Sequence, residues 1–111
     1  MHISILTYMD RAISTYNKEI FQNISLFQQD LSDKEFLNCV FKKCDFSECN
    51  FDNSIFVDCN FIDCNLSNIK VDDCSFQKVS FKQCKIIGVM FSYISTLLVD
   101  WIFEKCKIEL C

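Results

Sequence analysis

Large apolar residues recur at every fifth position through most of this chain. A second column, two residues before each of them, holds mainly small or apolar residues, most often cysteine. The run CVFKKCDFSECNF, residues 39–51, shows both columns. The other three positions of each unit are mostly Asp, Asn, Ser, Lys, Gln or Glu. The chain is therefore built on a five-residue repeat, and this repeat governs the fold.

We predict that the two columns form the structural core of the protein. The central column reads Phe36, Phe41, Phe46, Phe51, Phe56, Phe61, Leu66, Val71, Phe76, Phe81, Ile86 and Phe91. The column two residues earlier contributes Cys39, Cys44, Cys49, Cys59, Cys64, Cys74 and Cys84.

A period of five matches neither a helix nor a long strand, but it can be divided into a straight part and a corner. Residues two apart in a strand point to the same side, so both core columns face inward and the residue between them faces outward. The two polar residues that follow must turn the chain. Repeated corners of one sense wind the chain into a solenoid with one continuous interior, filled by alternating small and large side chains.

This pattern resembles the pentapeptide-repeat proteins, and the consecutive FxxCxF units are similar to the quinolone-resistance (Qnr-type) branch of that family. The resemblance is good over residues 21–91 and matches only the N-terminal half of a Qnr-type protein, without its dimerising helix. It implies an all-β fold, a right-handed quadrilateral parallel β-helix with four units per coil. Residues 20 apart would then stack, for example Phe41 on Phe61 and Phe61 on Phe81.

The two ends depart from the repeat. Leu6, Met9, Ile13, Tyr16 and Ile20 follow helical spacing, which predicts a short helix or an irregular cap over residues 1–20. The repeat should occupy residues 21–91. A loop or register break is expected over residues 92–100, and residues 101–111 fit a register shifted by two.

Composition bears on where in the cell the protein is expected and on the state of its cysteines. The chain has 111 residues, nine cysteines, one glycine and no proline, so hairpin-rich β-sheets are disfavoured. Its N-terminus lacks the basic start of a signal peptide, and the longest uncharged run, residues 86–99, is too short to span a membrane. We expect a soluble cytoplasmic protein, with no membrane association, whose thiols stay reduced.

The residues give little support to catalysis or metal binding. No CxxC pair occurs and the only histidine is His2, so zinc ligands do not converge. Stacked cysteines would be close enough for disulfides, but thiols in a packed interior are expected to behave as small hydrophobic groups. No His–Cys or His–Ser pair and no glycine-rich phosphate loop is present. We therefore predict a protein that is not an enzyme, with no catalytic residue, metal or cofactor.

Function is expected to reside on the surface. The formal net charge is −4, and residues 44–69 contain five acidic residues and no Lys or Arg, which disfavours direct nucleic-acid binding and favours a basic protein partner. The resemblance implies a DNA-like acidic rod that binds DNA gyrase or topoisomerase IV and relieves quinolone poisoning. The alternative is a structural or protein-interaction module without a topoisomerase role. Self-association through an exposed C-terminal coil is a further expectation. The candidate acidic partner-binding surface comprises Asp45, Glu48, Asp52, Asp58, Asp63, Asp72 and Asp73.

Overall fold

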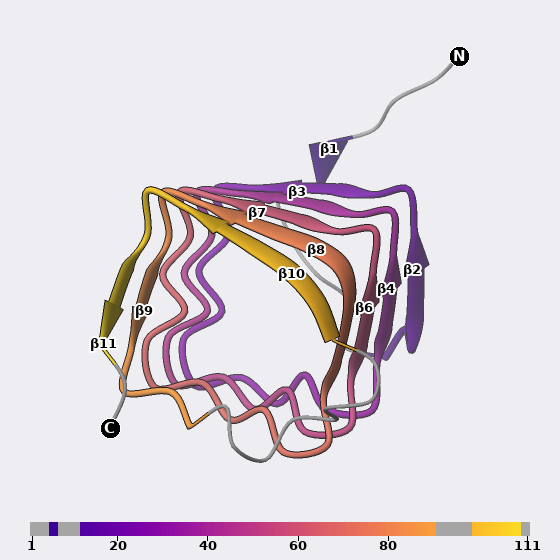
Figure 1. Cartoon of the computed structure of the whole chain (residues 1–111). Coiled ribbons are helices and arrows are strands. Elements are labelled where there is room, and N and C mark those ends of the chain that lie inside the picture. Colours follow the sequence, from indigo (N-terminus) through magenta and orange to yellow (C-terminus); the bar gives the residue numbers. More distant parts are fainter. Residues whose placement is uncertain (1–4, 7–11, 91–98, 110–111) are drawn as a thin grey trace.

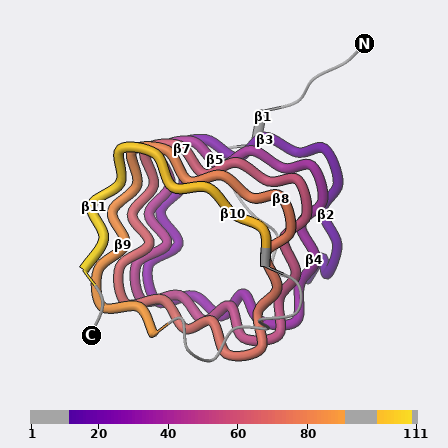
Figure 2. The backbone as a smooth tube through the Cα atoms, in the orientation of Figure 1, coloured from indigo at the N-terminus to yellow at the C-terminus, as the bar shows by residue number. Residues whose placement is uncertain are grey.

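The chain winds into a parallel β-solenoid of about four turns, and each turn is roughly square in cross-section (Figure 2). The computed structural model describes residues 5–6, 12–90 and 99–109. From β2 to β9 each coil takes 20 residues, so a unit lies directly over the unit 20 positions earlier; Glu35, for example, pairs with Ile55 and Ile55 with Ser75. The predicted all-β solenoid is thus confirmed.

We number the four sides of the coil in chain order. Sides 1 and 2 are formed by regular strands, on the right and at the top of Figure 1, whereas sides 3 and 4 are held mostly by isolated bridges. Side 1 contains β2 (Thr15–Asn17), β4 (Glu35–Leu37), β6 (Ile55–Val57) and the start of β8 (Ser75–Lys82). Side 2 contains β1 (Ile5–Leu6), β3 (Ile20–Gln22), β5 (Val40–Lys42), β7 (Asn60–Ile62) and the end of β8. Side 3 ends with β9 (Lys85–Ile87) and β11 (Lys107–Glu109), and β10 (Val99–Glu104) pairs with β8.

The core consists of aromatic rings stacked along the axis of the solenoid. Successive rings on one side are nearly parallel, with centroids 4.6–5.4 Å apart, while rings on neighbouring sides meet edge-on. Such offset stacks and edge contacts are the favoured geometries for aromatic pairs. The stack on side 1 is Tyr16, Phe36, Phe56 and Phe76, and that on side 2 is Phe21, Phe41, Phe61, Phe81 and Phe103.

Every corner is made by a residue in the left-handed backbone region. Every fifth residue from Lys18 to Gln83 has a φ between 52° and 63°, and Gly88 continues this corner column at 72°. Eight of the fourteen residues from Lys18 to Gln83 are Asn or Asp, which tolerate this conformation better than other residues with a Cβ atom. The corner therefore replaces the glycine turns that the composition lacks.

The coil begins earlier than predicted. No helix is present in the described part of residues 1–20, where β1 and β2 lie instead. Tyr16 is buried in the core, and its ring stacks on Phe36 at 5.4 Å, while Ile13 remains 43% exposed. The helical expectation was wrong because residues 15–17 pair with β4 and Tyr16 stacks on Phe36. These tertiary contacts outweigh the helical spacing of the apolar residues in the sequence. Residues 7–11 lie outside the described part of the chain.

The last coil is displaced in register. Phe103 pairs with Phe81 and Ile108 with Ile86, two residues beyond the usual spacing of 20. The pairing is irregular between Asp100 and Trp101, which lie opposite Gln77 and Val79. The corner residue Lys78 therefore has no paired residue in β10. The break expected over residues 92–100 falls largely outside the described residues, as does the predicted core residue Phe91. No helix of the described residues has the length and apolarity to cross a membrane.

Candidate functional site

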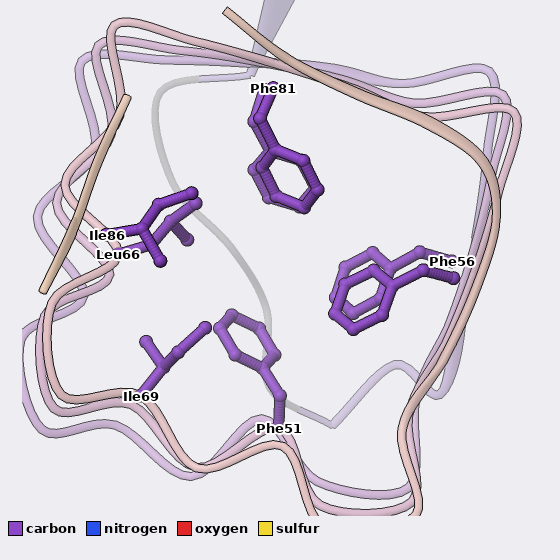
Figure 3. A pocket seen from close by; sticks show the side chains of 8 residues that line it. Phe51, Phe56, Leu66, Ile69, Phe81 and Ile86 are labelled. Atoms are coloured by element: carbon purple, nitrogen blue, oxygen red, sulfur yellow. The ribbon is translucent and has the colours of Figure 1, made fainter. Parts of the chain in front are cut away.

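The interior of the solenoid offers no room for a ligand. The predicted core residues that the structure describes are all buried, and the cavity on the axis has a volume of only about 10 Å³. Figure 3 shows Phe51, Phe56 and Phe81 pointing into this cavity, which has an entirely apolar lining. A space of this size holds at most one water, and an apolar one stays dry. In the described part of the solenoid, the search for a binding site therefore turns to the outer surface.

The inward small residues have a structural hydrogen-bonding role. The thiol of Cys49 donates to the carbonyl oxygen of Leu26 at 2.8 Å, and the hydroxyl of Ser54 donates in the same way to Leu31 at 2.8 Å. Both acceptors are central residues of the coil below. This shared bond explains why serine replaces cysteine in this column.

Two of the buried thiols, those of Cys49 and Cys74, are poorly suited to nucleophilic chemistry. Burial raises the pKa of Cys49 to about 11 and that of Cys74 to about 12, from an ordinary value of 9.0. The neutral thiol is a weak nucleophile and a weak metal ligand. The cysteines of the described residues are free thiols, and nowhere in that part of the chain do three or more His, Cys, Asp or Glu residues gather as metal ligands would.

Three of the predicted acidic residues come together at the corner between sides 4 and 1. The backbone N–H of Asp72 donates to the Asp52 carboxylate at 3.0 Å, and Asp73 follows at the exposed corner. Asp52 also forms an ion pair with Lys70 at 3.3 Å, so part of its charge is compensated within the protein. Asp72 and Asp73 present their carboxylates to solvent.

Two further acidic residues of this corner were not predicted. Asp33 belongs to the same corner column as Asp73, two coils below it, and its N–H donates to the carbonyl oxygen of Asp52 at 3.0 Å. Glu35 follows at the exposed start of β4. The sequence could have indicated both residues. Asp33 precedes Asp73 by 40 residues, which is two coils, and Glu35 follows Asp33 by two residues. We call this group, all from one corner, the acidic edge: Asp33, Glu35, Asp52, Asp72 and Asp73.

Asp45, predicted as a surface residue, has a structural role on side 3. Its carboxylate accepts hydrogen bonds from the N–H and the hydroxyl of Ser47, at 3.0 and 2.6 Å. Asn65, 20 residues later, accepts in the same way from the N–H of Ser67 at 3.1 Å. These Asx turns replace extended strand on side 3. Turn formation therefore accounts for the presence of Asp or Asn at this position.

The remaining predicted acidic residues are scattered around the coil. Glu48, Asp58 and Asp63 all belong to the corner column, but each lies at a different corner of the square. Lysines interrupt the acidic character between them; Lys42 and Lys82, for example, flank Ile62 on side 2. The structure thus brings Asp52, Asp72 and Asp73 together and separates the other four from them.

The outer surface of side 1 has a different character. Leu37 pairs with Val57, both half-buried, and Ile55 is 36% exposed on the same strand as Val57. Because core residues face the interior here, these three side chains form a small external apolar patch. Apolar patches rimmed by polar residues are typical of protein-binding surfaces.

Two shallow grooves also lie on the described surface. A groove of about 210 Å³ lies where β10 bypasses the corner at Lys78, with Asp100 and Ile102 on its other wall. A second, of about 280 Å³, lies on side 4 between Asp72 and Met90. Neither gathers a set of ionisable groups that would suggest catalysis.

Comparison with known proteins identifies the architecture. Residues 34–110 match the model of the pentapeptide repeat region. A search of curated proteins gave no significant match. The crystal structure of the pentapeptide repeat protein Rfr23 from the cyanobacterium Cyanothece 51142 superimposes with a TM-score of 0.77 at 19% identity, covering 86% of this chain and 64% of that one.

Two trypsin-treated variants of QnrB1, a plasmid-mediated fluoroquinolone resistance protein, share the fold more loosely. Their TM-scores are 0.53 and 0.55, at 22% and 21% identity, and each alignment covers 83% of this chain. The chain spans 64% of the Rfr23 chain and 44–45% of the QnrB1 chains. At these identities the likeness concerns the fold alone. The repeat, the square coil and the family match together establish that the chain belongs to the pentapeptide-repeat family.

Proposed function

We propose that this chain is a non-enzymatic binding protein whose acidic edge takes the place of DNA phosphates on DNA gyrase or topoisomerase IV. The observation that carries the proposal is the gathering of Asp33, Asp72 and Asp73 on one corner of a rigid rod. Successive coils are about 4.8 Å apart, so Asp33 and Asp73 lie two coils apart in one corner column, with Asn53 between them. QnrB1, a fluoroquinolone resistance protein, shares this fold, which supports the choice of enzyme.

The rigidity of the corner matters for affinity. The backbone N–H of Asn53 donates to the carbonyl oxygen of Asp72 at 2.9 Å, and that of Asp33 donates to Asp52 at 3.0 Å. Because the backbone beneath each carboxylate is fixed, little conformational entropy is lost when a basic partner binds. The like charges repel one another in the free protein, and a complementary basic groove would relieve that repulsion. Binding should therefore weaken with salt.

The direct test is a gyrase supercoiling assay in the presence of ciprofloxacin. We expect the wild-type protein to restore supercoiling at micromolar concentration. The triple variant Asp33→Asn, Asp72→Asn, Asp73→Asn should lose this effect, because it removes three charges while keeping a residue that tolerates the corner backbone.

The matched control is the double variant Asp58→Asn, Asp63→Asn, which makes the same chemical change at two other corners. It should protect gyrase nearly as well as the wild type. If the wild type neither protects nor inhibits either topoisomerase, the proposal fails. If both variants lose activity equally, overall charge rather than the acidic edge is responsible.

A second candidate function is a protein-interaction module without a topoisomerase role. The observation that favours it is the external apolar patch of Leu37, Ile55 and Val57, which has no counterpart on a DNA duplex. Substituting Ile55→Ser and Val57→Thr should leave a DNA-mimicking activity intact. The second function is favoured if the wild type has no effect on either topoisomerase; loss of gyrase protection in this variant, with its fold preserved by circular dichroism, would instead exclude the second function and make the patch part of the gyrase contact.

A further inference from the structure

Four cysteines occupy the same inward position of side 3 in consecutive coils. We call this group the cysteine ladder: Cys44, Cys64, Cys84 and Cys106. The residues that follow the first three cysteines are bridged in order, Asp45 to Asn65 and Asn65 to Lys85. In β11, Lys107 pairs with Lys85. The backbone register therefore places each cysteine of the ladder directly above the previous one.

The thiols of the ladder adopt a repeated geometry. The thiol of Cys84 donates to the carbonyl oxygen of Phe61 at 3.3 Å, and that of Cys106 to Phe81 at 3.2 Å. The thiol of Cys64 is within hydrogen-bonding reach of both Cys44 and Cys84. The N–H of Lys107 donates to the carbonyl oxygen of Cys84 at 3.0 Å, which ties the last coil to the one below it beside the two sulfurs.

The ladder has one end that solvent can reach. Cys44, Cys64 and Cys84 are each 2% exposed, whereas Cys106 is only partly buried. Within the described residues β11 pairs with β9 on one side only, while the ladder strands below have partners on both sides. An oxidant can therefore approach the sulfur of Cys106 but not those beneath it.

We propose that Cys106 and Cys84 form a peroxide-sensitive dithiol that closes to a disulfide and fastens the last coil to the coil below. The reagent is a hydroperoxide. In the first step the Cys106 sulfur, as thiolate, attacks the O–O bond. An S–O bond forms, the O–O bond breaks, and water or an alcohol leaves.

In the second step the sulfur of Cys84 attacks the sulfenic acid on Cys106. The S–S bond forms, the S–O bond breaks, and the hydroxyl group leaves as water with the proton of the Cys84 thiol. Two thiols lose two electrons in total, and the hydroperoxide gains two. A hydrogen bond from Cys64 lowers the pKa of Cys84 below its ordinary value, which favours the thiolate that this step needs.

Access from solvent, rather than the distance between the sulfurs, favours a disulfide at the end of the ladder. Neighbouring strands place the two Cα atoms about 4.8 Å apart, inside the range that disulfides accept. Sulfurs on adjacent parallel strands must still move toward each other. Within the described residues β11 has a neighbour on one side only and can adjust, whereas the segments bearing Cys44 and Cys64 are fixed between neighbours. The bond that forms should consequently be easy to reduce.

The test is peptide mapping after treatment with hydrogen peroxide, in a Cys111→Ser background that removes a cysteine outside the described residues. Free thiols are alkylated in denaturant and the peptides are analysed by mass spectrometry. We expect one intrachain bond, Cys84–Cys106, with the loss of two titratable thiols, both recovered with dithiothreitol. Amide hydrogen exchange in β11 should slow at least severalfold on oxidation, because the bond restricts opening of the last coil.

Two variants sharpen the result. In Cys84→Ser, peroxide should leave a sulfenic acid on Cys106 that dimedone traps, since no second thiol can attack it. Serine is tolerated in this column, as Ser54 shows on side 1. The matched control Cys74→Ser, also in a buried inward position but outside the ladder, should form the Cys84–Cys106 bond as the wild type does.

Several outcomes would overturn the proposal. One is a covalent dimer through Cys106 on a non-reducing gel. Another is oxidation of Cys106 beyond sulfenic acid while Cys84 stays free in the wild type. A disulfide between Cys39 and Cys59, or between Cys44 and Cys64, would show that solvent access at Cys106 does not control which thiols are oxidised.

Discussion

At the scale of single residues, the most demanding position of this fold is the corner rather than the core. A left-handed backbone is unfavourable for a residue with a Cβ atom by roughly 1–2 kcal/mol. Asn and Asp reduce that cost, but several corners carry Lys, Gln or Glu, for example Lys43 at φ 52° and Gln28 at φ 61°. The folded coil therefore holds strain at these positions, which substitution can relieve.

Lys43→Asn is expected to stabilise the protein by up to about 1 kcal/mol, because Asn adopts the corner conformation more readily. The opposite effect is expected for Asn38→Val, at another corner. This change should destabilise the protein by about 1–2 kcal/mol, because β-branched residues are the least tolerant of a positive φ. Urea denaturation measures both. The control is Lys42→Asn, one residue earlier in β5, which should give no gain. Equal effects at residues 42 and 43 would contradict the explanation.

A second residue-scale prediction concerns alkaline pH. Burial raises the pKa of Cys49 to about 11 and of Cys74 to about 12, above the ordinary thiol value of 9.0. The unfolded chain therefore releases these protons at lower pH than the folded protein does. Their contribution to stability is fully present below about pH 9 and is lost as the pH rises toward 11–12.

Thermal unfolding at pH 8 and pH 10.5 tests this linkage. The wild type should lose more stability across the interval than the variant Cys49→Ser, Cys74→Ser, in which neither position titrates. Other groups, such as the lysines, contribute equally to both proteins and cancel in the comparison. Parallel pH profiles would rule out the thiols as the cause.

At the scale of the elements, the strands are too short to be stable by themselves, and their stability comes from the aromatic stacks. Phe61 lies at the centre of one stack, with ring centroids 4.6 Å from Phe41 and 5.0 Å from Phe81. Its side chain is 1% exposed. Each strand is thus held from above and below by both its backbone and its ring.

Phe61→Ala is predicted to destabilise the protein by about 3–5 kcal/mol, because the surrounding stack cannot collapse into the space that the ring leaves. A large fraction of the protein should unfold, or its melting temperature should fall sharply. Phe27→Ala is the matched control, as this phenylalanine is 46% exposed and should change stability little. A small effect of Phe61→Ala would be incompatible with the stacked core.

The sequence was sufficient to predict the coil and most of the core, and its failures have physical causes. The two inward columns repeat so regularly that the core residues could be predicted from spacing, whereas the stacking of Phe41, Phe61 and Phe81 also required the four units per coil that the family resemblance implies. Tyr16 was misjudged because its strand is specified by the edge of β4, 20 residues away, and not by its neighbours. The turn made by Asp45 was not predicted, because a carboxylate that accepts hydrogen bonds within its own turn cannot be distinguished by composition from one that does not.

At the scale of the whole molecule, the two ends of the solenoid differ. At the N-terminal end the buried Lys34 donates from its ammonium group to the carbonyl oxygen of Ile13 at 2.7 Å, and β1 pairs with β3. At the other end Ile108 is 40% exposed although it occupies an inward position. In the described part of the chain, β10 and β11 also present an unpaired edge. Such an edge invites pairing with another chain.

We expect self-association through this C-terminal end, measurable by sedimentation velocity over a range of protein concentrations. Ile108→Lys should shift the equilibrium toward monomer, because a charge would be buried in the contact. Ile55→Lys, on the outer surface of side 1, is the control and should leave the equilibrium unchanged. A wild type that remains monomeric at high micromolar concentration would exclude this interface.

The register shift between β8 and β10 has a consequence for how such a protein can change over generations. Phe103 still stacks on Phe81, and Ile108 still lies over Ile86, although the intervening coil is two residues longer than the others. Each coil pairs with the edge of the coil before it. A change in the length of one connection therefore does not disturb the pairing of the strands that follow. Insertions and deletions between β9 and β10 are therefore expected to be inherited with little loss of stability. The same changes within a strand would displace a ring from its stack and be eliminated by selection.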